Sequence, residues 1–189
     1  MARGLARDHD EKRRTLRKGA AAYFAAHGFD RASMTGAARA CGVSKALIYH
    51  YWGSKEDLLC DILTDHLGAL VAVVEAAKGE GMRGLIRVIL AAYEDADAEH
   101  KLQLDALSVL PADRQAPLIA LQRRLVEVMS GAVADLCPDQ SPDRIRALTM
   151  SVFGILNWFY MWHRPGKGLD RAAYAELASD FVAGGLRGL

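Results

Sequence analysis

The sequence predicts an all-α protein of about nine helices, built as a small N-terminal part of three helices and a larger helical body. Alanine, leucine and arginine are plentiful and only five of the 189 residues are proline, which favours helix over sheet. Apolar residues recur at helical spacing through most of the chain. No segment shows the alternating pattern of a strand, and no internal repeat is present.

The composition limits the class of protein. Apolar residues make up 51% of the chain and charged residues 25%, as in ordinary globular domains. No apolar run could span a bilayer, and the charged N-terminus lacks the apolar segment of a signal peptide, so we expect no membrane and a cytoplasmic location. Cys41, Cys60 and Cys137 are widely spaced and odd in number, which favours reduced thiols over disulfides.

The net charge of +1 hides an asymmetry along the chain. Residues 1–55 carry 11 basic and 4 acidic residues, a net charge of +7, whereas residues 56–189 carry 13 basic and 19 acidic residues, a net charge of −6. A basic head suits a polyanionic partner. Uneven solvated charge without any partner would explain this distribution equally well.

The first predicted helix covers residues 11–27, where apolar residues fall at helical spacing. Residues 1–10 lack this periodicity and are expected to form a mobile arm. Gly28 follows the helix as a C-terminal stop, and Phe29 should plug the small core.

The next two predicted helices are short and lie close together. The second covers residues 35–40, with Thr35 as its expected N-cap. Gly42 supplies the positive φ of a tight turn at little steric cost. Ser44 then caps a third helix, predicted through Tyr51.

Ala38, Gly42 and Ile48 have the small–glycine–apolar spacing of a helix-turn-helix. Ile48 should face inward, and Trp52 is expected to be buried. The opposite face of the third helix would then present a set of residues outward. These residues are Lys45, Ala46, Tyr49 and His50.

A fourth helix should begin at a capping-box-like sequence, Ser54–Asp57, and run to about Ala77. We place the domain boundary within the start of this helix. The predicted domains are 1–55 and 56–189, with residues 55–77 forming the connecting helix.

Five further helices are predicted in the body, bounded by glycines, prolines and capping residues. The helix 141–163 is apolar on almost every face and must therefore be buried on every face. Together with the apolar stripe of helix 170–185, it could form a four-helix interface between two copies of the chain. The predicted body helices are 85–100, 102–110, 117–137, 141–163 and 170–185.

The sequence contains no catalytic constellation. The patterns GxSxG, HExxH, GxxxxGK[ST] and GxGxxG are absent, and the six histidines are scattered. Cys60 and His66 lie six residues apart and would not share a helix face, which argues against a metal site. We therefore expect no enzymatic activity, no metal and no cofactor.

The segment Gly42–Leu58, reading GVSKALIYHYWGSKEDL, resembles the DNA-binding domain of the TetR/AcrR family of transcriptional repressors. It combines the helix-turn-helix spacing with an aromatic run and a following lysine, and the resemblance extends over about residues 11–65. Residues 36–38 depart from the family's pattern, which often has a larger residue before the inward alanine. This departure predicts a looser second helix.

The resemblance implies an N-terminal helix-turn-helix domain and a C-terminal helical domain for ligand binding and dimerisation. It implies a homodimer, formed through helices 141–163 and 170–185, that binds a palindromic double-stranded DNA operator and is released by a small-molecule effector. The positions resembling the family's base-reading contacts are Lys45, Ala46 and His50. The positions resembling its phosphate contacts are Thr35, Ser44, Tyr49, Tyr51 and Lys55.

The effector is expected to be small and partly apolar. Residues 157–165 and the following 166–170 weakly resemble a subgroup of the family associated with acyl-CoA or aromatic-CoA ligands, which suggests an acyl-CoA or related acid. Candidate ligand contacts are polar or aromatic residues of the body helices, although core packing is the stronger explanation for each one alone. The candidates are Tyr93, His100, Met129, Asn157, Trp158 and Trp162.

Two other functions fit the sequence less well. The first is a helical ligand-binding or protein-interaction module that does not bind DNA; salt-dependent affinity for duplex DNA would distinguish it. The second is a metal or redox sensor, which the absence of ligand spacing disfavours.

Overall fold

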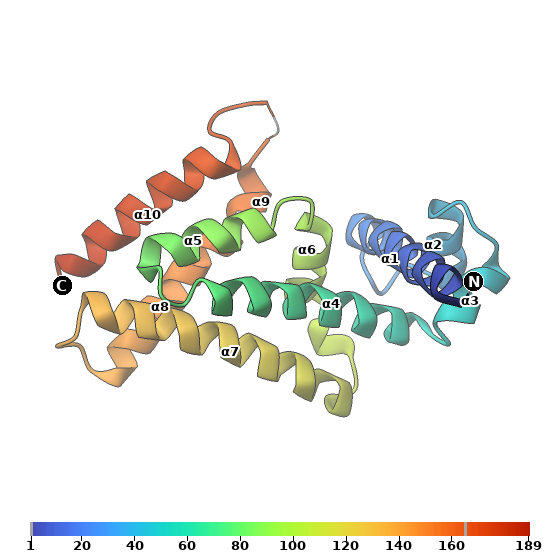
Figure 1. The fold of residues 1–189 in the computed structure, drawn as a ribbon, viewed down its shortest axis with the longest axis horizontal. Helices are drawn as coiled ribbons and strands as arrows, with labels where there is room; N and C mark the ends of the chain where they lie inside the picture. The colour runs from blue at the N-terminus through green and yellow to red at the C-terminus, as the bar shows by residue number, and fades with distance from the viewer. Residues whose placement is uncertain (1, 165) are drawn as a thin grey trace. The chain divides into compact units, whose positions relative to one another are not determined.

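The described elements are all helical, which confirms the predicted fold class (Figure 1). The computed structural model describes the backbone of residues 2–164 and 166–189, and their side chains apart from those of residues 2–6 and 8. The helices are α1 (Ala2–His27), α2 (Met34–Ala40), α3 (Lys45–Tyr51), α4 (Lys55–Ala76), α5 (Gly81–Ala92), α6 (Asp97–Ala106), the 3-10 helix η1 (Leu107–Val109), α7 (Ala112–Leu136), α8 (Pro142–Asn157), α9 (Phe159–Trp162) and α10 (Arg171–Arg187).

Predicted capping residues begin several of these helices. The Ser44 hydroxyl accepts a hydrogen bond from the Leu47 amide at 3.1 Å, and the Ser54 hydroxyl accepts one from the Asp57 amide at 3.0 Å. Such bonds satisfy amides that have no partner inside the helix. Ser141 and Asp170 cap α8 and α10 in the same way.

The predicted cap of α2 is wrong by two residues. Ser33, in extended conformation, accepts a hydrogen bond from the Gly36 amide at 3.1 Å and is the N-cap. Thr35 lies inside the first turn of the helix and is exposed. Two capping residues compete for one helix start here, and Met34 decides between them because its buried side chain must lie on the helical face.

The predicted arm over residues 1–10 is also wrong within the described residues, because α1 already begins at Ala2. A helix does not need apolar periodicity to extend from a packed segment. Residues 2–10 contain good helix formers and no proline, and extending an existing helix avoids the cost of nucleation.

Two long helices predicted in the body are interrupted. The predicted helix 85–100 breaks after Ala92, where Asp95 adopts a positive φ of 59°, so that α5 and α6 are separate. The predicted helix 141–163 ends at Asn157, and the short α9 follows after Trp158. Neither break is marked by glycine or proline, which explains why local sequence did not predict them.

The chain forms two compact units. Unit 1 contains α1 to α3, α4 as far as His66, and the segment Ala96–Leu118 with α6 and η1. Unit 2 contains the remainder, Leu67–Asp95 and Ile119–Leu189. Helices α4 and α7 each begin in unit 1 and end in unit 2. The domain boundary predicted at residue 55 stays a prediction, and the two units are described separately below.

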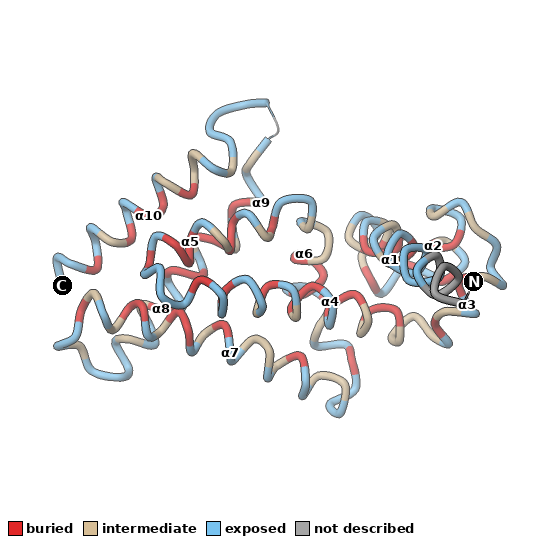
Figure 2. Tube along the Cα trace, viewed as in Figure 1, coloured by how far each residue is buried: buried red, intermediate tan, exposed pale blue. Residues whose placement is uncertain are grey.

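The core of unit 1 is formed where α1 packs against α2 and α6. Phe24 and Phe29 meet edge to face with ring centroids 5.4 Å apart, and Ile48 of α3 is fully buried. Phe29 therefore plugs this core as predicted. Buried residues recur along α4 at helical spacing (Figure 2).

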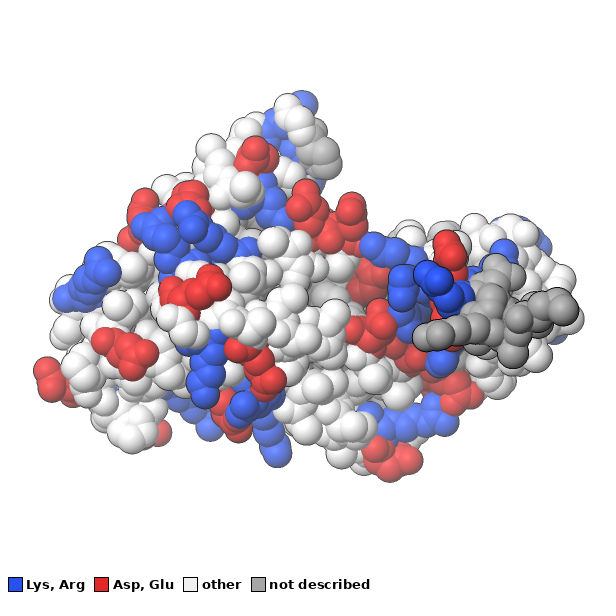
Figure 3. Space-filling model, in the orientation of Figure 1, with Lys and Arg blue, Asp and Glu red and all other residues white. Residues whose placement is uncertain are grey.

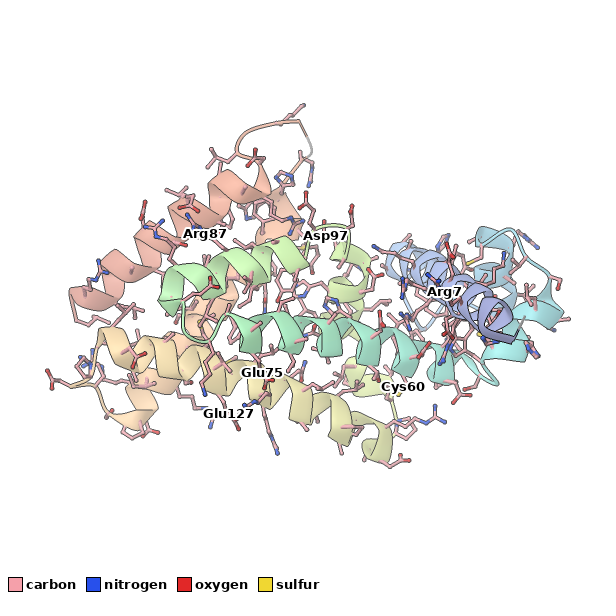
Figure 4. All side chains as sticks on the ribbon, in the orientation of Figure 1. Arg7, Cys60, Glu75, Arg87, Asp97 and Glu127 are labelled. Atoms are coloured by element: carbon pink, nitrogen blue, oxygen red, sulfur yellow. The ribbon has the colours of Figure 1, made fainter. Side chains whose placement is uncertain are left out.

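The core of unit 2 is formed largely by α5 and α10, which pack along each other. Their outer edges carry ion pairs: Arg83 and Arg87 of α5 bind Glu176 of α10, and Arg83 also binds Asp180 (Figure 4). Arg124 of α7 similarly binds Glu75 of α4. In the described parts of the chain, no helix is both long and apolar enough to cross a membrane.

Candidate nucleic-acid interface

Helix α3 has a buried side and an open side. Ile48 is completely buried, as predicted, and anchors the helix in unit 1. The side chains predicted to point outward are exposed, including Tyr49 at 42%. The exposed residues are Ser44, Lys45, Ala46, Tyr49 and His50. A helix held by one apolar anchor, with amphipathic and basic groups on its free side, can enter the major groove.

The turn before α3 has the geometry expected of a helix-turn-helix. Gly42 has a φ of +67°, and its amide donates to Arg39 O at 3.0 Å. The amide of Val43 donates to Ala38 O, also at 3.0 Å. These bonds fix the angle between α2 and α3 and therefore the direction in which α3 presents its open side.

Helix α2 is not loosened by its small residues. A Cβ added to Gly36 would lie 2.0 Å from the Tyr23 hydroxyl oxygen, so the tyrosine of α1 occupies the space that a side chain would fill. Ala37 and Ala38 are buried. The departure from the family's pattern in α2 is thus matched by a large residue in α1, and the two helices stay in close contact.

Tyr51 lies at the end of α3, beside α1. Its ring is 4.8 Å from the ring of His9, and His9 and His50 lie edge to face at 6.5 Å. Tyr51 is half-buried, which allows its ring to pack while its hydroxyl is directed outward. The extension of α1 toward its N-terminus therefore supports the C-terminal end of α3.

Trp52 is buried, as predicted, and is fixed by α4. Its indole nitrogen donates to the Asp61 carboxylate at 3.1 Å. The other oxygen of Asp61 accepts from Arg13 of α1 at 2.9 Å, and Arg17 lies 3.6 Å from the carboxylate. One carboxylate of α4 thus connects the end of α3 to α1.

Lys55 is placed differently from the other predicted phosphate contacts. Its ammonium donates to the main-chain oxygens of Phe29, Asp30 and Ala32 at 2.8, 3.4 and 3.2 Å. It also lies 4.3 Å from the centroid of the Phe29 ring. The side chain is half-buried and directed into unit 1.

The charge asymmetry of the sequence does not survive folding intact. Asp61 and Asp65 of α4 neutralise arginines of α1, and Asp57 binds Arg114 of α7. Counted over unit 1, the chain has 13 basic and 12 acidic residues, a net charge of +1. Basic and acidic side chains lie next to each other over α1 (Figure 3). Attraction to a polyanion must therefore come from the local charges around α3 and not from the whole unit.

Two of the six predicted ligand contacts meet in unit 2. The Tyr93 hydroxyl donates to the side-chain oxygen of Asn157 at 2.9 Å. Tyr93 is almost completely buried, and this burial raises the pKa of its hydroxyl. The pair joins the end of α5 to the end of α8. Met129 of α7 is buried in the same unit.

The two tryptophans among the predicted ligand contacts are largely on the surface. Trp158 is 59% exposed at the break between α8 and α9. Trp162 packs against Phe159 and Tyr174, with ring centroids at 5.0 and 5.3 Å, and its remaining surface is open. Pro165, part of the subgroup resemblance, lies outside the described residues.

His100 lies in unit 1, in a polar cluster that sequence reasoning missed. Its ring centroid is 6.0 Å from that of His66, and Gln103 bonds to His66. All three residues are buried. Burial and the neighbouring His100 lower the pKa of His66 to about 4, while Gln103 opposes this effect. The available signal was the spacing of His100 and Gln103 on one face of a helix.

The described residues contain no group of three or more His, Cys, Asp or Glu side chains arranged to hold a metal ion. Cys41 is half-buried between α1 and α2, and burial raises the pKa of its thiol. A raised thiol pKa lowers the fraction of reactive thiolate at neutral pH.

Two protein-family models match this chain. The model described as bacterial regulatory proteins of the tetR family matches residues 16–62, which contain α2, α3 and the start of α4. The model described as the C-terminal domain of tetracyclin repressor-like proteins matches residues 75–186, more than half of the chain.

Individual proteins show the same similarity. The HTH-type transcriptional regulator BetI of Rhizobium meliloti (strain 1021) is 34% identical over 121 residues, which span 60% of this chain and 60% of BetI. A TetR-family transcriptional regulator from Bordetella parapertussis 12822 superposes with a TM-score of 0.85 at 31% identity, covering 90% of this chain and 93% of that one.

A third structure shares the fold at lower identity. AibR, solved in complex with isovaleryl coenzyme A and operator DNA, superposes with a TM-score of 0.75 at 22% identity, covering 92% of this chain and 96% of its own. With one family matched over the helix-turn-helix and over most of the remaining helices, the chain belongs to the tetR family of bacterial regulatory proteins.

Proposed function

We propose that the chain is a ligand-responsive transcriptional repressor that acts in the cytoplasm and binds a palindromic operator as a homodimer. The observation that carries this proposal is the geometry of α3: Ile48 anchors one side, while Lys45 and His50 are exposed on the other. Family membership supports the same function.

Within this proposal the open side of α3 divides into two groups. Lys45, Ala46 and His50 meet base edges, with Ala46 small enough to approach the groove floor or a thymine methyl. Hydroxyl groups at both ends of the helix-turn-helix hold the phosphate backbone in register. These are the hydroxyls of Thr35, Ser44, Tyr49 and Tyr51.

DNA binding can be tested without knowing the operator. The wild-type protein selects duplexes from a random-sequence pool, and affinity for the selected duplex is then measured against salt concentration. We expect a steep linear fall of log K with log salt. Tyr49→Phe and Lys45→Ala should weaken binding, whereas Arg123→Ala, a change in unit 2, should not. A flat salt response would favour a helical module that does not bind DNA.

A second copy of the chain fits the open face of α8 and α10. Met150 and Trp158 on α8 and Leu177 and Phe181 on α10 are all more than half exposed, with Phe181 at 70%. A largely apolar groove of about 520 Å³ lies between the two helices. Monomers rarely expose such contiguous apolar surface, and two helices from each copy would bury it in a four-helix interface.

Dimerisation has its own test. Phe181→Glu should shift the protein toward the monomer in sedimentation equilibrium and weaken operator binding, because each half-site alone holds one reading helix. Ala172→Glu, an exposed position on the opposite side of α10, is the matched control and should leave the dimer intact.

The proposed effector is small and partly apolar, an acyl-CoA or related acid. AibR, which shares the fold, was solved with isovaleryl coenzyme A. The buried pair Tyr93 and Asn157 and the cluster around His100 supply the few polar groups that an apolar site needs for orientation. Binding would act through α4, which begins beside α3 and continues into unit 2.

Effector binding can be separated from DNA binding by thermal unfolding. Isovaleryl coenzyme A, coenzyme A and isovalerate are added in turn to the protein, and a ligand of the native state should raise the midpoint in proportion to the logarithm of its concentration. Tyr93→Phe and His100→Gln should reduce that increase. No change in the midpoint with any thioester or free acid would rule out this effector class.

A further inference from the structure

The side chain of Lys55 is bound inside unit 1. Its ammonium lies 2.8 Å from Phe29 O, 3.2 Å from Ala32 O and 3.4 Å from Asp30 O. A lysine ammonium has three N–H donors and no acceptor. All three donors are therefore used by main-chain oxygens of one turn.

That turn sets the start of the helix-turn-helix. The Ala32 amide donates to Gly28 O at 3.0 Å, which closes the turn. The next residue, Ser33, is the N-cap of α2, and α2 packs against α3. Phe29 adds a second attachment, because its buried ring lies 4.3 Å from the Lys55 ammonium.

A phosphate contact by Lys55 would have to break this arrangement. Recruiting one N–H to DNA would leave a main-chain oxygen of the turn without its donor, at the cost of an unsatisfied buried acceptor. The exposed Lys45 has no such obligation. Its ammonium lies over the ring of Tyr49, one turn along its own helix, at 5.6 Å.

We infer that Lys55 is a positioning residue of the DNA interface, which holds the 29–32 turn against the start of α4, and that it does not bind phosphate. By fixing the turn it fixes the N-cap of α2 and, through α2, the direction of the reading helix. The part of this inference that concerns DNA rests on the proposed function.

The chain offers a matched control. Lys45 and Lys55 are each the first helical residue after a capping serine, so Lys45→Met and Lys55→Met make the same change in the same local setting. Both variants are tested against the duplex selected by the wild-type protein, at several salt concentrations and at a temperature well below their unfolding midpoints.

For Lys55→Met we expect affinity to fall about tenfold, with an unchanged slope of log K against log salt. The loss should persist at temperatures at which the variant is fully folded, which a role in stability alone would not produce. Amide exchange of residues 29–35 should accelerate in this variant only. For Lys45→Met the magnitude of the slope should decrease by about 0.9 for each phosphate that the variant no longer neutralises.

Two results would overturn the inference. One is a slope for Lys55→Met reduced as much as that of Lys45→Met, since this would assign Lys55 to phosphate. The other is full affinity in folded Lys55→Met, since the turn would then not position the reader. Failure of the wild-type protein to bind any duplex would instead refute the proposed function, and amide exchange would still test whether Lys55 holds the turn.

Discussion

Helices α3 and α4 begin with the same dipeptide and use it in opposite ways. Ser44 and Ser54 both cap their helices through the hydroxyl. Lys45, which follows the first serine, is exposed, whereas Lys55, which follows the second, is bonded to three main-chain oxygens. Local sequence therefore decides that a helix begins, and the tertiary surroundings decide whether its first lysine can reach a ligand.

The contrast extends along both helices. The outward side chains of α3 have few partners within the unit and are free to contact DNA. On α4, the carboxylates of Asp57 and Asp61 and the imidazole of His66 are all engaged by residues of unit 1. We expect changes on α3 to alter DNA binding at constant stability, and changes on α4 to alter stability.

The largest effect is expected from charge reversal on α3. Lys45→Glu should lower affinity for the selected duplex about a thousandfold, since each of two half-sites loses an interaction on the order of 2 kcal/mol. The thermal midpoint should stay within about 2 °C of wild type because the residue is exposed. Fluorescence anisotropy with labelled duplex measures the affinity. A loss below tenfold would show that α3 does not read DNA through this residue.

Acidification should destabilise the protein through His66 of α4. Its pKa is lowered to about 4 from an ordinary 6.5. Between these values the unfolded chain binds a proton that the folded protein does not. The stability present above pH 6.5 should therefore fall by up to about 3 kcal/mol as the pH approaches 4.

Urea unfolding across this pH range measures the effect. His66→Gln should remove most of the pH dependence, whereas His27→Gln, at an exposed position, should leave it unchanged. Equal pH profiles for wild type and His66→Gln would contradict the assignment.

An intermediate effect is expected at Asp61, which binds both Trp52 and Arg13. Asp61→Ala should lower the free energy of unfolding by about 2 kcal/mol, because it leaves the buried indole N–H without an acceptor. Asp65, which is 56% exposed and pairs with Arg17, is the control, and Asp65→Ala should cost less than about 1 kcal/mol. Chemical denaturation compares the two; equal losses would remove Asp61 as the link between α3 and α4.

The smallest effect compares the two caps directly. Ser44→Ala and Ser54→Ala should each lower stability by about 1 kcal/mol, because each helix loses one capping bond. Only Ser44→Ala should also weaken DNA binding once both variants are fully folded, since its hydroxyl is exposed at the proposed interface. Reduction of affinity in both variants to the same extent would show that capping alone controls the interface.

Much of unit 1 could be predicted because its signals are local. Ser44 and Ser54 mark helix starts, Gly42 marks a turn, and Ile48 and Trp52 are apolar at positions that must face inward. The predictions failed where two local signals competed, as for Thr35 and Ser33, or where a helix breaks at ordinary residues, as at Asp95.

The ligand candidates show the limit of local reasoning. Tyr93 and Asn157 lie 64 residues apart and form a hydrogen bond that only folding could bring about. His66 of α4 meets His100 and Gln103 of α6 only in the folded unit, and neither His66 nor Gln103 carried a signal of its own along the chain. Trp158, apolar by type, is exposed because α8 ends before it.

The sequence by itself determined the all-α fold, the helix-turn-helix and the family, because apolar periodicity, capping residues and turn glycines act over a few neighbouring positions. Only the tertiary structure decided which charges remain available. Arg13, Arg17 and Lys55 contribute to a basic head in the sequence, but in the fold they are bound to Asp61, Asp65 and the 29–32 turn. A charge can act on a partner only where no nearer group has already paired with it.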